Sequence, residues 1–191
     1  MTFLRIAVWI LVPLVLLAAV ALAVIAGRRH RPALALWCAA PVAIGLGAIV
    51  FGIVVPPPVH TLTVIAALAA AALGVVAGNP ITVAVLDFAD RGSGTASVMN
   101  GTHGGILVSE EGHESPQREV LRGGTTIGYL ERLVVLTAVA VGHWEIVAAL
   151  IAIKGLGRFS ELDSPETRER FIIGTLVSLV WAGACAALFA F

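Results

Sequence analysis

The chain alternates between long apolar runs and short polar connections, and this pattern predicts its elements. Runs of about 18 or more apolar residues are long enough to cross the hydrocarbon layer of a bilayer. Glycine, proline and charged residues mark where one run ends and the next begins. The pattern predicts about six hydrophobic helices, at residues 3–27, 33–55, 61–78, 125–142, 145–157 and 171–191. The predicted fold class is an all-α, polytopic transmembrane helix bundle that forms a single membrane domain over residues 1–191.

Prolines refine the second and third helices. Pro41 lies inside the second run and is expected to kink it, and the three prolines at 56–58 cannot continue a helix. Gly78-Asn79-Pro80 has the composition of a helix stop followed by a new start, so residues 81–89 are expected to form a short interfacial helix. The fourth and fifth helices are short and carry charges. A re-entrant pair, or four full spans in total, is therefore the alternative to six spans.

One long polar connection, residues 91–124, interrupts the apolar pattern and predicts a loop. Lysine and arginine collect on the cytoplasmic side of a membrane. Most basic residues lie in alternate connections, namely Arg28, Arg29, Arg31, Arg91, Arg118, Arg122, Arg158, Arg168 and Arg170. Six spans then place the long loop in the cytoplasm and both termini outside, in a multi-pass protein of the inner (cytoplasmic) membrane. Arg5, close to the first residue, is the exception.

Composition supports the membrane class. Apolar residues make up 59% of the chain and charged residues 13%, whereas a soluble domain carries about 25% charged residues. The net charge is zero and the basic residues are scattered, so nucleic acid is not a predicted partner. Cys38 and Cys185 each lie in an apolar run and match no metal-binding spacing. We predict no metal site and no cofactor, and membrane lipids as the surroundings of the helices.

Small residues recur at four-residue spacing on two of the predicted helices. The first stripe contains Ala66, Ala70, Gly74 and Gly78, and the second contains Gly174, Ser178, Ala182 and Ala186. In lipid, helices associate through close backbone approach rather than through exclusion of water. We expect these stripes to pack helices together within the chain. A seam between copies in a homo-oligomer is the alternative.

Three charged residues lie inside apolar runs, where each costs about 2.5–3.5 kcal/mol to insert. Glu131 and Lys154 lie eleven and nine residues from opposite sides of the turn at 142–145, which gives depths of roughly 16 and 14 Å. We therefore predict a Glu131–Lys154 ion pair. Arg132 is expected to turn toward the cytoplasmic headgroups or a second carboxylate, and Arg158 shares a helix face with Lys154. The cluster serves either as a relay or polar substrate site, or as a pair that fixes helix register.

The last third of the chain contains Glu131, Arg132, Lys154 and Arg158 within a recognisable sequence pattern. The segments are Gly124–Arg132, Ala152–Lys154, Arg158–Phe159 and Glu169–Ser178. Over residues 123–182 this arrangement resembles a family of uncharacterised bacterial integral membrane proteins of actinobacterial character. The resemblance implies a polytopic inner-membrane protein and no assigned activity.

Three functional hypotheses follow from these observations. The first is a non-enzymatic membrane component or accessory subunit that binds a protein partner, and the small polar inventory favours it. The second is a small transporter or channel built around Glu131, Arg132 and Lys154. The third is a lipid-handling enzyme in which the same three residues line a headgroup site. Separate candidates for contacts with lipid headgroups are Arg28, Arg29, Arg122 and Arg170. A cavity that reaches Glu131 would favour a transporter, whereas a solid interior would favour an accessory subunit.

Overall fold

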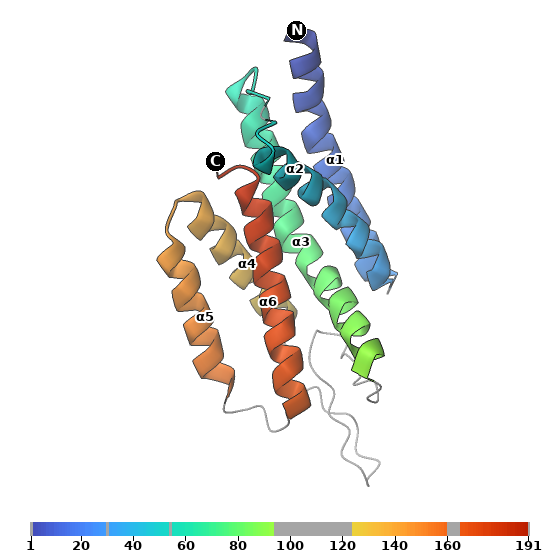
Figure 1. Ribbon diagram of the computed structural model, residues 1–191, viewed down its shortest axis with the longest axis vertical. Coiled ribbons are helices and arrows are strands. Elements are labelled where there is room, and N and C mark those ends of the chain that lie inside the picture. The colour runs from blue at the N-terminus through green and yellow to red at the C-terminus, as the bar shows by residue number, and fades with distance from the viewer. Residues whose placement is uncertain (1, 30, 54, 94–123, 160–164, 191) are drawn as a thin grey trace.

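The computed structural model describes residues 2–29, 31–53, 55–93, 124–159 and 165–190, and every regular element in these ranges is a helix. The elements are α1 (Thr2–Arg28), the 3₁₀ helix η1 (Pro32–Cys38), α2 (Ala39–Val50), α3 (His60–Ser93), α4 (Gly124–Ala140), α5 (Trp144–Phe159) and α6 (Pro165–Ala187). Successive segments run in opposite directions along the bundle (Figure 1). The predicted all-α class is confirmed. Most of the predicted loop 91–124 lies outside the described residues.

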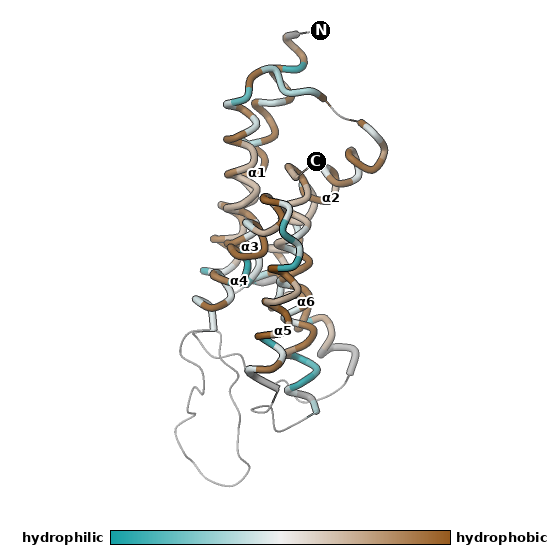
Figure 2. The backbone as a smooth tube through the Cα atoms, turned by 90° about the vertical axis from the view of Figure 1, so that its left-hand side faces the viewer, coloured by the Kyte–Doolittle hydropathy of each residue, from teal (hydrophilic) through white to brown (hydrophobic). Residues whose placement is uncertain are grey.

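Four helical segments are long and apolar enough to cross a membrane: Phe3–Arg28, Ala33–Val50, His60–Ala89 and Thr167–Ala187. Hydrophobic residues cover most of the length of these segments (Figure 2). The two helices of the α4–α5 hairpin have only 17 and 16 residues, whereas a full span needs about 20. The described chain therefore has six α-helices, of which the hairpin is the part that falls short of a span.

The centre of the bundle is α3, which packs against α1, η1, α4 and α6. The small-residue stripes lie in these contacts: Ala66, Ala70 and Ala182 are almost fully buried. A Cβ atom added at Gly74 would lie 3.2 Å from the Cβ of Cys185, and one at Gly174 would lie 3.4 Å from Cγ2 of Thr82. Close backbone approach therefore brings α3 and α6 together within one chain. Self-association of copies stays a prediction.

The predicted helix stop at residues 78–80, with a separate interfacial helix at 81–89, is wrong. Instead α3 continues through Pro80 as one helix of 34 residues. Pro80 has no N–H to offer the carbonyl of Val76, which normally ends or kinks a helix. Tertiary contacts override this signal, since α1 and α6 pack along α3 and a side chain from α4 bonds the carbonyl of Val75.

Two other boundaries differ from the sequence prediction. The second apolar run begins as the 3₁₀ helix η1 and its helix ends at Val50 rather than Val55, because the chain turns at Gly52, which has a φ of 69°. Pro41 lies in the first turn of α2, where a proline is better tolerated than in mid-helix. The last helix begins at Pro165 rather than residue 171, with proline at its first position.

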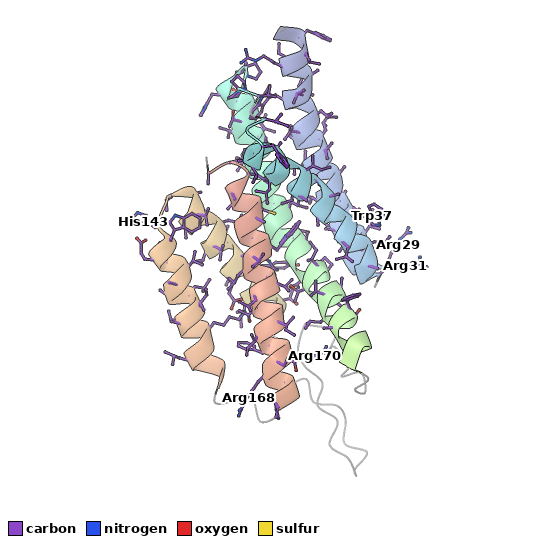
Figure 3. The ribbon with its side chains drawn as sticks, in the orientation of Figure 1. Arg29, Arg31, Trp37, His143, Arg168 and Arg170 are labelled. Atoms are coloured by element: carbon purple, nitrogen blue, oxygen red, sulfur yellow. The ribbon has the colours of Figure 1, made fainter. Side chains whose placement is uncertain are left out.

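The ends of the helices carry the polar residues that the orientation argument used. Figure 3 labels Arg29 and Arg31 beyond the end of α1, and Arg168 and Arg170 at the start of α6. His143 lies at the α4–α5 turn, far from Arg168 and Arg170 along the bundle but at nearly the height of Arg29 and Arg31 (Figure 3). The exceptional Arg5 donates a hydrogen bond from Nη2 to the Pro56 carbonyl (3.0 Å), which ties α1 to the connection before α3.

Candidate functional site

The α4–α5 hairpin brings Glu131 and Lys154 together, as the depth argument predicts. The turn passes through Gly142, whose φ of 76° favours glycine. Lys154 Nζ donates to Glu131 Oε2, and both side chains are largely buried. Lys154 Nζ also lies 5.7 Å from the centre of the Phe171 ring on α6. Since α5 packs chiefly against α4, these contacts of Lys154 are an important link between α5 and the rest of the bundle.

Arg132 does not turn toward the headgroups or a second carboxylate, so that prediction is wrong. Its side chain is 1% exposed, the largest of the fully buried side chains among the described residues. Nε donates to the Val75 carbonyl (2.9 Å), Nη1 to Ser178 Oγ (3.0 Å) and Nη2 to Asn79 Oδ1 (3.3 Å). Arg132 therefore joins α4 to both α3 and α6 at the centre of the bundle.

Glycine makes the space for this guanidinium. A Cβ atom at Gly78 would lie 2.4 Å from Cδ and 2.6 Å from Nε of Arg132, closer than any non-bonded contact allows. A Cβ atom at Gly128 would lie 3.5 Å from Arg132 Nη1. The sequence analysis placed Gly78 in a packing stripe and at a helix stop. In the structure, the side chain of Arg132 packs directly on the backbone of Gly78.

No carboxylate in the described part of the chain forms an ion pair with Arg132. All three of its hydrogen-bond acceptors are neutral, and the carboxylate of the adjacent Glu131 is bonded to Lys154. The Tyr129 ring lies 5.3 Å from the guanidinium carbon, a weak cation–π contact. Two cations and one anion leave the cluster with a net formal charge of one positive unit. A buried cation without a charge partner is costly.

A cavity of about 120 Å³ lies beside this cluster. Its polar lining comes from Asn79, Thr82, Glu131, Arg132, Lys154 and Ser178. Gly124, Gly128 and Gly174 complete the wall together with Ile127, so backbone is close to the space. Residues from α3, α4, α5 and α6 all contribute, and Gly124 is the first residue of α4. The cavity is therefore a polar site assembled by four helices.

One group on the cavity wall has no partner within the described residues. The hydroxyl oxygen of Thr82 is buried and forms no hydrogen bond. An unsatisfied buried polar atom costs about 1–3 kcal/mol and calls for an explanation such as a ligand or water. Sequence reasoning missed Thr82 and Asn79, although polar residues in an otherwise apolar helix were a signal. Ser178 was identified only as a packing residue.

The other candidate residues are distributed differently. Arg28 and Arg29 are exposed at the end of α1, Arg170 is half-buried near the start of α6, and none of these three lines the cavity. Arg158 belongs to α5, but its side chain lies outside the described part, as does all of Arg122. The structure thus brings Glu131, Arg132 and Lys154 together and leaves the candidate headgroup arginines apart from them.

Comparison of the chain with family models, curated proteins and solved structures finds no match to any of them. The resemblance of residues 123–182 to bacterial membrane proteins stays a prediction. Function must therefore be argued from the site itself.

Proposed function

We propose that this protein is a small anion-binding membrane protein of the transporter class, with its binding site in the cavity beside Arg132. The observation that carries the proposal is the uncompensated guanidinium on the wall of a polar cavity. A bound anion would neutralise the net positive charge of the cluster and satisfy donors that have no partner inside the described structure. Ionisable groups at membrane depth typically mark substrate or ion pathways.

The cavity favours transport over an accessory subunit. An accessory subunit was expected to be packed solid at Glu131, and instead Glu131 borders open space. A lipid-handling enzyme was expected to use the same three charged residues, which line the cavity, but the candidate headgroup arginines at the helix ends do not line it. Beyond Arg132, toward the α4–α5 turn, the interior is apolar and closed by buried Leu73, Leu136 and Trp181. Transport would require α4, α5 or α6 to move at this barrier.

The membrane location belongs to the same proposal. We infer a multi-pass protein of the inner membrane with both termini outside, because most basic residues lie in alternate connections between the apolar runs. Arg168 and Arg170, at the start of α6, would then face the cytoplasm (Figure 3). The four apolar segments that are long enough to span a bilayer support this location.

Cysteine labelling of intact cells tests the orientation. The variants Arg168→Cys and His143→Cys place single exposed thiols at the start of α6 and at the α4–α5 turn, which lie far apart along the bundle (Figure 3). We expect a membrane-impermeant maleimide to label H143C in intact cells and R168C only after lysis. The unmodified chain is the control, since Cys38 and Cys185 are 0% and 1% exposed and should not react. Labelling of both variants in intact cells would contradict the proposed topology.

A pair of threonine substitutions on α3 tests anion binding. Thr82 and Thr63 both have buried hydroxyls without a partner, but only Thr82 lines the cavity. Replacing either with valine removes an unsatisfied group, so folding should be maintained or improved. We expect Thr82→Val to weaken anion binding about tenfold, through loss of a hydrogen bond to a charged ligand. Thr63→Val should leave binding unchanged.

The measurement uses the full chain in nanodiscs of phosphatidylcholine, with anion-dependent thermal stabilisation as the binding signal and anion flux into proteoliposomes as the transport signal. Equal anion binding by the wild type and both variants would show that Thr82 is not part of the binding site. Absence of stabilisation by any inorganic or organic anion would end the proposed function. Binding without flux would retain the site and exclude the transporter class.

A further inference from the structure

The lining of the cavity contains one negatively charged acceptor among many donors. Lys154 is bonded to Glu131 Oε2, and a carboxylate has about four acceptor positions on two oxygens. Glu131 Oε1 forms no hydrogen bond with another described residue, and Glu131 is 8% exposed. A site for a fully deprotonated anion gains nothing from such a group, because like charges repel at short range. A ligand that carries its own proton can instead donate it to the carboxylate.

The hydrogen-bond donors around the cavity indicate the shape and charge of the rest of the ligand. A planar guanidinium, an ammonium and the hydroxyls of Thr82 and Ser178 surround the cavity. Guanidinium groups match the geometry of phosphate and carboxylate oxygens. Gly124 adds the first turn of α4, where backbone N–H groups favour an anion. Donors from four helices suit a tetrahedral oxyanion with several acceptor oxygens better than a planar group with two.

The volume of the cavity and the net charge of its lining further limit which ligands fit. A cavity of about 150 Å³ holds a benzene ring of six heavy atoms, so 120 Å³ fits the five heavy atoms of a phosphate group, and the open side of the cavity leaves room for a substituent on that phosphate. The net charge of one positive unit matches a singly charged oxyanion. A phosphate monoester has a second pKa of about 6, so about a tenth of it keeps its P–OH at pH 7 and most of it does below pH 6.

We propose that the cavity selects a phosphate group that still carries a P–OH, which donates to Glu131 while Arg132 and Lys154 hold its other oxygens. This inference rests on the proposed anion-binding function and names its ligand class. Sulfate has the same shape but two charges and no proton, so Glu131 rejects it. A phosphodiester has one charge but no P–OH, so it is rejected as well. Inorganic phosphate and the headgroup of a phosphomonoester lipid share this chemistry, and both are candidate ligands.

The first experiment compares inorganic phosphate with sulfate. The full chain in phosphatidylcholine nanodiscs is titrated with each anion near pH 7 by calorimetry. We expect phosphate to bind at least about tenfold more tightly than sulfate, as one hydrogen bond to a charged group allows. Glu131→Gln should bring the two affinities to within about threefold by strengthening sulfate binding. Equal affinities in the wild type would overturn the ligand assignment but leave anion binding intact, whereas no binding of either anion or lipid overturns both proposals.

The second experiment distinguishes the sources of the phosphate and does not depend on a variant that must fold. Nanodiscs that contain phosphatidic acid, a monoester, are compared with nanodiscs that contain phosphatidylglycerol, a diester, by native mass spectrometry of retained lipid. Selective retention of phosphatidic acid, with loss of the calorimetric phosphate signal, assigns the lipid headgroup. A phosphate signal that phosphatidic acid leaves unchanged assigns the free ion. Equal retention of both lipids, with loss of the calorimetric phosphate signal in both kinds of nanodisc, would overturn the requirement for a P–OH.

Discussion

Replacing Lys154 with methionine is expected to destabilise the protein by about 3–5 kcal/mol, because the buried Glu131 carboxylate then loses its cationic partner. The carboxylate is held between α4 and α5 with little access to water. Methionine matches the length of the lysine stem, so the variant removes charge with little change in packing. The free energy of unfolding in detergent micelles, measured by denaturant titration, reports the effect.

The double variant Glu131→Gln with Lys154→Met separates the ion pair from other causes. With both charges gone, most of the lost stability should return, since neutral replacements of a buried pair are often tolerated. Glu145→Gln is the matched control, because Glu145 forms its ion pair with His143 at the exposed end of the same hairpin and exposed pairs contribute little. A double variant as unstable as Lys154→Met alone would show that the pair does not hold α5 on α4.

The ion pair was predictable from sequence because it depends on local geometry. Two helices joined by a tight turn are antiparallel, so distance from the turn fixes depth, and the apolar surroundings of Glu131 and Lys154 require a partner for each. The all-helical class was predictable for a similar reason, since the length of apolar runs reflects the solvent around them. Neither inference needed knowledge of how distant helices pack.

The position of Arg132 was not predictable in the same way. Its acceptors on α3 and α6 lie 46 to 57 residues away in sequence, and its access to α3 depends on the missing side chain of Gly78. The same packing explains why α3 continues through Pro80 against local propensity. Local signals for a helix stop were therefore outweighed by tertiary contacts, and the polar cavity that results could be found only from the structure.

The second prediction concerns the contact between Arg132 and the backbone of α3. Replacing Gly78 with alanine should lower the free energy of unfolding by about 3–5 kcal/mol. The new Cβ would lie 2.4 Å from Arg132 Cδ, so the side chain must move and lose charge-assisted hydrogen bonds worth about 1.5–3 kcal/mol each. Gly155→Ala is the control, because nothing lies within 4 Å of a Cβ at that helical position. That change should be neutral or stabilise by up to about 1 kcal/mol.

A double-mutant cycle tests whether the cost of Gly78→Ala comes from its contact with Arg132. Arg132→Ala removes the guanidinium, so adding Gly78→Ala to it should have almost no further cost and can even stabilise the helix. The free energy of unfolding of the four proteins, measured in the same micelles, gives the coupling between the two positions. If Gly78→Ala costs as much without the arginine as with it, then the glycine serves helix packing alone. A coupling of about 3 kcal/mol, at the upper end for residues in contact, would instead establish that the backbone of α3 is shaped to hold a cation.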